Sequence, residues 1–270
     1  MARVVAIVDP SNAAASELAR QVGAEVCLLE RALAVADAVV IAAPTGAHAA
    51  LVAQALNAGR HVLVEKPLCI AAAEAHALCA TAGARGVVLA VGHSERFNPA
   101  IRALVDLGLN FTHVATRRLS SIAAQPLSGG LLLNLGVHDL DLAAYLARHT
   151  ATLLSARGHA DHAELSASAG PCAASLELGQ GGRARIRTLQ ARTAAGGLYE
   201  ADLARATLER VDGKLTSRLA TPEGEPLAAQ AEAFLRAIGG RSSAALASGL
   251  DGARAVGLAE QAQACINDSP

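Results

Sequence analysis

An acid and an amine stand next to each other in the segment Glu65-Lys66-Pro67. The mostly apolar run 61–64 before them predicts a buried strand, which places both ionisable groups at its carboxyl end. A lysine partly removed from water has a lowered pKa and can exchange a proton with a substrate hydroxyl. The alternative interpretation is a plain Glu-Lys pair at a strand end.

A second set of polar residues interrupts the apolar segment 131–145. In a helix, Asn134, His138, Asp141 and Tyr145 would follow one another at i, i+4, i+7 and i+11 and would share one face. A polar stripe on an apolar helix lines a site, and its histidine is suited to proton transfer. A buried structural histidine is the alternative.

Two further segments place polar groups where open α/β sheets bind ligands. Asp9 closes the apolar run 4–8, at the position where a dinucleotide-binding fold carries a ribose-binding carboxylate. In the segment 43–48, Thr45 stands at a predicted helix N-terminus beside a strand end, with His48 in the first helical turn. A simple turn and a simple helix cap are the alternatives.

Elements that would position these residues alternate along the first hundred positions. The predicted strands are 4–8, 25–28, 38–42, 61–64 and 87–91, and the predicted helices are 11–22, 46–58 and 71–82. Strands that alternate with helices at this spacing indicate a parallel, doubly wound sheet.

The pattern changes after about residue 110. Alternating segments without intervening helices predict an antiparallel sheet; they are 153–159, 173–178, 184–189, 201–208 and 214–219. Two amphipathic helices follow at 226–238 and 250–266. The predicted fold is therefore α/β, with an incomplete Rossmann-like parallel sheet in residues 1–100. An α+β domain for substrate binding and oligomerisation is expected at 101–270.

Composition narrows the function classes. A net charge of −1 and an aromatic content of 2% offer neither a phosphate track nor stacking platforms, so nucleic acid is not an expected partner. The five cysteines are scattered without a C-x-x-C pair, which predicts neither disulfides nor a metal site. No apolar run approaches the roughly 18 residues of a membrane span, and the first apolar run is too short for a secretory signal. A cytoplasmic protein is expected.

Five motifs together closely resemble the glucose-fructose oxidoreductase / inositol dehydrogenase (Gfo/Idh/MocA) family. They are D-P at 9–10, A-P-T-x-x-H at 43–48, G-R-H-V-L-V-E-K-P at 59–67, V-G-H-S-E-R-F-N-P-A at 91–100 and G-G-L-L-L-N-L-G-V-H-D-L-D at 129–141. The G-H-x-E-R-F-N-P motif is most similar to the branch that oxidises the 3-hydroxyl of UDP-N-acetylglucosamine.

The resemblance implies nicotinamide-dependent hydride transfer at a carbinol of a sugar or UDP-sugar. It assigns catalysis to Lys66 and His138, with Asn134 beside them. It implies NAD rather than NADP, because Asp9 would hold the adenosine ribose. The other implied cofactor contacts are Pro44, Thr45, His48 and Glu65, and the implied substrate contacts are Arg96, Asn98 and Asp141. A homo-oligomer through the C-terminal sheet is also expected.

Two departures from the family pattern affect this expectation. The family usually has an acid where this chain has Asn134, and it begins with a strand and a G-x-G-x-x-G turn that are not found here. Without that central strand, 4–8 and 38–42 are expected either to lie side by side or to flank an empty slot. We expect impaired activity from either a fragment of a longer product or a shortened protein. The alternative is a non-catalytic sugar-nucleotide-binding or scaffold protein.

Overall fold

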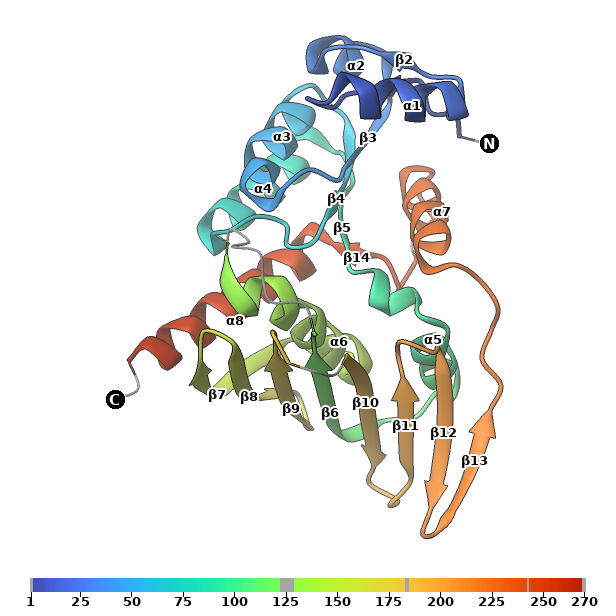
Figure 1. Ribbon diagram of the computed structural model, residues 1–270, viewed down its shortest axis with the longest axis vertical. Coiled ribbons are helices and arrows are strands. Elements are labelled where there is room, and N and C mark those ends of the chain that lie inside the picture. Colours follow the sequence, from blue (N-terminus) through green and yellow to red (C-terminus); the bar gives the residue numbers. More distant parts are fainter. Residues whose placement is uncertain (1, 122–128, 183–184, 242, 269–270) are drawn as a thin grey trace.

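The computed structural model describes residues 2–121, 129–182, 185–241 and 243–268. Figure 1 shows a smaller α/β unit at the N-terminal end and a broad sheet covered by helices on one side. The N-terminal elements are β1 (Ala6–Ile7), α1 (Asn12–Val22), β2 (Glu25–Val26), α2 (Leu29–Val35), β3 (Ala38–Ile41), α3 (Thr45–Asn57), β4 (His61–Glu65), α4 (Ala72–Arg85) and β5 (Leu89–Gly92). This alternation of strands and helices is the predicted one.

The parallel strands of this unit fall into two groups. β3, β4 and β5 are parallel neighbours, whereas β1 pairs only with β2 among the described strands. The separation of β1 from β3 is one of the two arrangements that the sequence predicts. Among the described strands β3 pairs only with β4, and Val40 within it is 65% exposed.

The remaining elements build the second part. They are a 3-10 turn η1 (Ser94–Phe97), α5 (Pro99–Asp106), β6 (Phe111–Leu119), a π-helical turn η2 (Leu132–Gly136), α6 (Val137–Ala147), β7 (Ala151–His159), β8 (His162–Ala169), β9 (Cys172–Gly179), β10 (Ile186–Thr193), β11 (Leu198–Asp202), β12 (Thr207–Asp212), β13 (Leu215–Leu219), α7 (Pro226–Ile238), β14 (Ala247–Ser248) and α8 (Gly249–Asn267). Together the two parts confirm the predicted α/β class with a Rossmann-like sheet and a further large sheet.

The large sheet has the strand order β13-β12-β11-β10-β6-β9-β8-β7. Its pairs are antiparallel, as the sequence predicts, except β6 and β9, which run parallel. The single strand predicted at 201–208 is wrong, because β11 and β12 meet there in a hairpin. β6, β8, α2 and α5 are not predicted by the sequence pattern.

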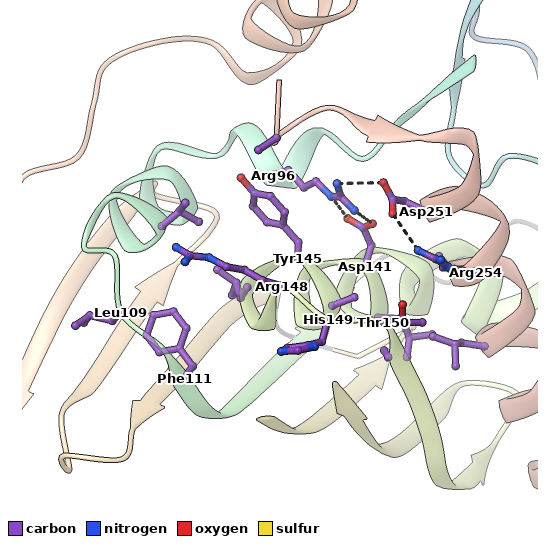
Figure 2. A pocket seen from close by; sticks show the side chains of 18 residues that line it. Arg96, Leu109, Phe111, Asp141, Tyr145, Arg148, His149, Thr150, Asp251 and Arg254 are labelled. Atoms are coloured by element: carbon purple, nitrogen blue, oxygen red, sulfur yellow. Dashed lines mark hydrogen bonds and ion pairs between the residues drawn. The ribbon is translucent and has the colours of Figure 1, made fainter. Parts of the chain in front are cut away.

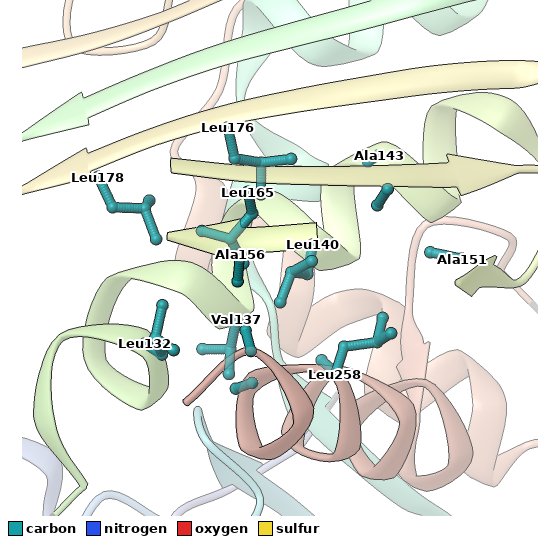
Figure 3. Close-up of a cluster of buried hydrophobic side chains, with 14 of the residues drawn as sticks. Leu132, Val137, Leu140, Ala143, Ala151, Ala156, Leu165, Leu176, Leu178 and Leu258 are labelled. Atoms are coloured by element: carbon teal, nitrogen blue, oxygen red, sulfur yellow. The ribbon is translucent and has the colours of Figure 1, made fainter. Parts of the chain in front are cut away.

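The core of the second part lies between the sheet and helices α6 and α8. Leu140 and Val137 from α6 meet Leu165 and Leu176 from the strands, and Leu258 of α8 closes the cluster (Figure 3). These side chains are apolar, and their burial removes from water the surface that drives folding.

Helix α8 also joins the two parts of the fold. Strand β14, immediately before α8, pairs antiparallel with β5 of the first sheet. Ser248 begins the helix with a capping box, in which its hydroxyl accepts from the Asp251 amide and Asp251 accepts from the Ser248 amide. Gly252 then packs directly on Val91 of β5. Strand β14, near the C-terminal end of the chain, therefore extends the N-terminal sheet.

Candidate active site

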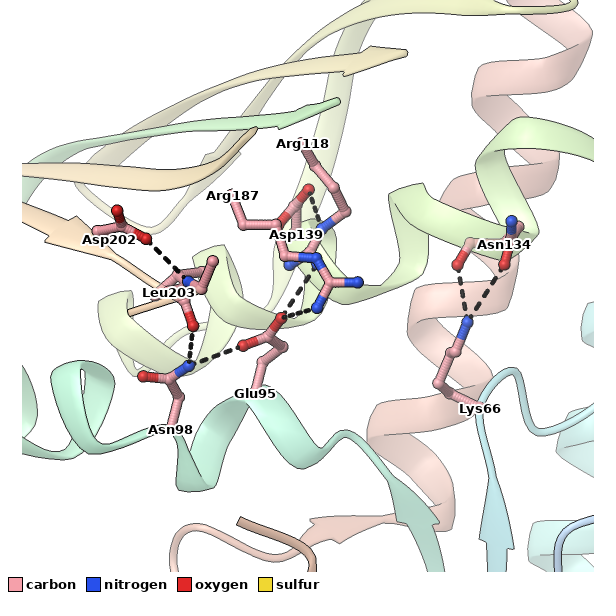
Figure 4. Close-up of polar contacts among 10 residues, drawn as sticks. Lys66, Glu95, Asn98, Arg118, Asn134, Asp139, Arg187, Asp202 and Leu203 are labelled. Carbon is pink, nitrogen blue, oxygen red and sulfur yellow. Dashed lines mark hydrogen bonds and ion pairs between the residues drawn. The ribbon is translucent and has the colours of Figure 1, made fainter. Parts of the chain in front are cut away.

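Lys66 lies at the carboxyl end of β4 and reaches across to the second part of the fold. Its Nζ donates a hydrogen bond of 2.8 Å to the Asn134 backbone oxygen and lies 3.4 Å from Asn134 Oδ1 (Figure 4). Asn134 stands in the π-helical turn η2, a geometry that is common at functional sites because it disturbs the regular helical hydrogen bonds. Asn134 thus positions the lysine.

The environment of Lys66 changes its acidity. The pKa of Lys66 is lowered to about 8, mainly by burial and also by the nearby Arg118 guanidinium, while Glu65 acts in the opposite direction. An amine with a pKa of about 8 is close to the optimum for exchanging protons near neutral pH. The ionisable pair at 65–66 therefore has the electrostatic character that the sequence predicts for proton transfer.

His138 lies one turn further along, near the start of α6. The side chain is half-buried, and its buried Nδ1 has no hydrogen-bond partner within the described part of the chain. Burial, together with Arg118 and Lys66, places the pKa of His138 well below its ordinary value, so the ring is neutral at pH 7. The His93 ring packs against it edge to face, with 6.4 Å between ring centroids.

A buried ion network next to these groups was not predicted from the sequence. Arg118 of β6 forms two hydrogen bonds of 3.0 Å with the Asp139 carboxylate and a third of 3.0 Å with Glu95. Arg187 of β10 approaches the same Glu95 oxygen to 4.0 Å (Figure 4). Glu95 stands within the conspicuous 91–100 motif, and this is the one signal that pointed to it.

The predicted nucleotide side of the site is distributed over three strand ends. Asp9 follows β1 and is exposed, with Oδ1 accepting from the Ser11 amide at 2.7 Å. Pro44 and Thr45 begin α3 directly after β3, and Glu65 ends β4. A Cβ at Gly92 would lie 2.9 Å from the Glu65 carboxylate, so only glycine there leaves room for this side chain. An exposed carboxylate and a helix N-terminus at these strand ends fit a dinucleotide.

His48 and Asn98 occupy different positions from those expected. The His48 ring is buried, and its nitrogens lie 2.8 Å from the Pro67 and Ala43 backbone oxygens. The Asn98 amide bonds the Leu203 oxygen at 2.8 Å, and its Oδ1 caps α5 through the Ala100 amide. Their polar groups bind the protein itself in this structure, so direct contacts with cofactor or substrate stay predictions.

Arg96 and Asp141 form a bidentate buried pair rather than an open binding surface. Arg96 Nε donates to Asp141 Oδ2 at 2.8 Å, and Nη2 donates to Oδ1 at 2.5 Å. The guanidinium carbon lies over the Tyr145 ring, 4.8 Å from the ring centroid. The pair lines a cavity of about 560 Å³ among α5, α6 and α8 (Figure 2). Lys66 and His138 are not among the residues that line this cavity. The substrate roles of Arg96 and Asp141 therefore remain predictions.

Neither a metal cluster nor a membrane span accompanies this site. In residues 2–121, 129–182, 185–241 and 243–268, no three His, Cys, Asp or Glu side chains group so that they could hold a metal ion. Over the same described ranges, no helix combines the length and apolar character needed to cross a membrane.

The parallel strands, the polar groups at their carboxyl ends and the lysine with a lowered pKa are features of a Rossmann-type dinucleotide site. Residues 1–93 match the family model Gfo/Idh/MocA, described as an oxidoreductase family with an NAD-binding Rossmann fold. The match covers about the first third of the chain, and the resemblance predicted from the sequence is confirmed there.

Individual relatives are similar over different lengths. UDP-N-acetylglucosamine 3-dehydrogenase from Acidithiobacillus ferrooxidans is 39% identical over 115 residues, which cover 42% of this chain and 37% of the relative. Inositol 2-dehydrogenase from Rhizobium meliloti is 33% identical over 156 residues, which cover 54% and 47%. The matched segments thus span less than half of these two curated relatives.

The similarity in structure extends further. The solved structure of the Acidithiobacillus ferrooxidans UDP-N-acetylglucosamine 3-dehydrogenase superimposes with a TM-score of 0.89 at 27% identity. The superposition covers 97% of this chain and 89% of that chain. Both parts of the fold therefore follow this oxidoreductase architecture.

Proposed function

We propose that the chain transfers a hydride between NAD and a hydroxyl-bearing carbon of a sugar nucleotide. The 3-hydroxyl of UDP-N-acetylglucosamine is the candidate position, supported by the similarity to the Acidithiobacillus ferrooxidans enzyme. The observation that carries the proposal is the Lys66 amine, with a pKa of about 8, anchored on Asn134 at the end of a Rossmann strand.

The proposed chemistry follows from the protonation states of the two groups. In the oxidising direction, the neutral Lys66 amine takes the hydroxyl proton while the carbon–oxygen bond becomes a carbonyl. Bound NAD⁺ supplies the acceptor for the hydride that leaves this carbon. His138, neutral because of its burial, acts as a hydrogen-bonding partner rather than as a charged acid. The reverse direction returns the proton from the Lys66 ammonium.

The proposed cofactor contacts lie at the strand ends. Asp9 would hold a ribose, a contact that disfavours the extra 2′-phosphate of NADP. Thr45 and Pro44 would border the cofactor at the start of α3, and Glu65 would do so beside Lys66.

Kinetics of NADH formation tests the proposal. Purified protein is assayed with NAD⁺ and UDP-N-acetylglucosamine, and Lys66→Met is compared with Lys214→Met, which changes an exposed lysine in the turn before β13. Lys66→Met should lower kcat by about 10² to 10⁴, the usual contribution of general acid–base catalysis, whereas Lys214→Met should not. Equal activity of the two variants would remove Lys66 from the mechanism.

The oligomeric state and the cellular location also remain proposals. We infer a homo-oligomer through the face of the large sheet that points away from α6, where Arg117 and Glu177 form an exposed pair. Light scattering on the purified chain tests the oligomeric state. A cytoplasmic location stays a prediction from the sequence.

A further inference from the structure

Two arginines stand directly opposite each other in the large sheet. Arg118 of β6 and Arg187 of β10 are cross-strand partners in an antiparallel pair. Opposed residues of such a pair lie on the same face, and like charges in this position repel. The arrangement is therefore unfavourable unless other groups compensate both charges.

The countercharge is shared unequally between the two arginines. Arg118 is buried and holds the Asp139 carboxylate with two hydrogen bonds and Glu95 with a third. Arg187 forms no hydrogen bond to a described side chain, and its closest carboxylate oxygen is Glu95 Oε1 at 4.0 Å. That oxygen is the one that already accepts from Arg118. The Arg187 guanidinium thus keeps N–H donors that no described residue of the chain accepts from.

Arg187 is placed where a ligand of the candidate active site can reach it. Its side chain is 37% exposed, in contrast to 4% for Arg118. It contributes to the low pKa values of both Lys66 and His138, which places it within electrostatic range of the proton-transfer groups. Burial and the repulsion from Arg118 also lower the pKa of Arg187, and they outweigh the attraction of Glu95.

We propose that Arg187 binds an anionic group of the substrate, a phosphate or a carboxylate, and so selects charged sugar derivatives over neutral polyols. A planar guanidinium offers a bidentate fork for either oxyanion. An incoming anion would supply the countercharge that Glu95 shares between two arginines. This inference rests on the proposed function, because it names the substrate class of that same site.

Equilibrium binding without cofactor separates the inference from the reaction. Calorimetry would compare four ligands: UDP-N-acetylglucosamine, UDP, glucuronate and myo-inositol. Arg187→Gln should weaken the binding of the anionic ligands by about 10- to 100-fold, as expected for a lost charged hydrogen bond, and leave myo-inositol unchanged. Arg187→Lys should restore part of the loss, since it keeps a point charge without the fork. Loss confined to UDP ligands identifies a phosphate, and loss confined to glucuronate identifies a carboxylate.

Arg192→Gln is the matched control. Arg192 lies on the same strand, is exposed and is partnered in register with His113 at the far end of β6. Its replacement should leave all four affinities within twofold. Thermal unfolding should show Arg187→Gln at least as stable as the parent chain, because the repulsion with Arg118 is removed.

The possible outcomes distinguish the two proposals. Anionic binding that is absent in the parent chain, or unchanged by Arg187→Gln, overturns the role of Arg187. Arg187-dependent binding without NADH formation leaves that role standing and contradicts the proposed oxidation. Turnover of myo-inositol with no preference for charged sugars contradicts the inference while the oxidoreductase assignment stands.

Discussion

Replacing Lys66 by methionine should stabilise the folded chain at neutral pH. The pKa of Lys66 falls from its ordinary 10.5 to about 8 in the folded state, and about 1.4 kcal/mol per tenfold change makes this a cost of about 3 kcal/mol below pH 8. Methionine keeps the stem volume but removes the charge. The lost hydrogen bond to Asn134 offsets about 1 kcal/mol, so the variant should gain about 2 kcal/mol at pH 7.

The sign of the pH dependence follows from proton binding. Between pH 8 and 10.5 the unfolded chain protonates Lys66 and the folded chain does not, so the stability of the parent protein rises with pH. The advantage of Lys66→Met should therefore shrink by about 3 kcal/mol across this window and end as a disadvantage of about 1 kcal/mol.

Urea denaturation of both proteins between pH 7 and pH 10 measures this difference. Lys214→Met is the control, because Lys214 is exposed and its replacement should give a difference that does not change with pH. The sequence contains only these two lysines, so NMR of isotopically labelled lysine side chains can follow the Lys66 titration directly. A stability difference that is constant with pH, or a Lys66 midpoint near 10.5, would refute the reasoning.

Three other substitutions test neighbouring parts of the argument. Asn134→Asp places a carboxylate within about 3.4 Å of Lys66 Nζ and should raise the pKa of Lys66. Because the neutral amine is the base in the oxidation, the acidic limb of the pH–rate profile should move to higher pH, and an unmoved limb would contradict direct contact. Arg118→Met removes the cation that Asp139 and Glu95 share, and it should lower the free energy of unfolding by about 3 to 5 kcal/mol. The control Arg117→Met, in an exposed ion pair, should lower it by less than about 1 kcal/mol. Equal losses in denaturant would show that the buried network is not coupled. Gly252→Ala brings a Cβ to 2.5 Å from Val91 Cγ2 and should lower the free energy of unfolding by about 1 to 3 kcal/mol. Gly257→Ala places its Cβ 3.7 Å from Ala72 and should raise the free energy of unfolding by about 0.5 to 1 kcal/mol. Melting temperatures that move in the same direction for both variants would contradict this packing.

Local sequence predicted most of the regular elements, because their periodicity and end signals lie within a few residues. Gly23 ends α1 with a left-handed conformation, as its position after Val22 predicts. α7 and α8 match their predicted ranges to within one residue. The hairpin between β11 and β12 was missed because its turn, 203–206, contains neither Gly nor Pro.

In the candidate site, too, some features were visible in the sequence and others were not. The polar stripe of α6 and the Glu65-Lys66 pair were visible in the sequence because each lies within one element. Only the family resemblance related the two, since Lys66 and Asn134 are 68 positions apart and meet only when β4 approaches η2. Arg96 and Asp141 were each visible as candidate substrate contacts, but the sequence did not show that they bond each other in a buried place.

What the sequence by itself determined is the identity and chemical type of the groups: an amine at a strand end, a histidine on an apolar helix, and an alternation of elements that requires a parallel sheet. The tertiary structure alone decided which charges are compensated. Asp139 and Glu95 come from segments far from Arg118 and Arg187 in the chain, and only the pairing of β6 with β10 brings the two arginines into opposition. Charge interactions depend on distance and burial rather than on order along the chain, so the low pKa of Lys66 and the sharing of Glu95 between Arg118 and Arg187 emerge only from the fold.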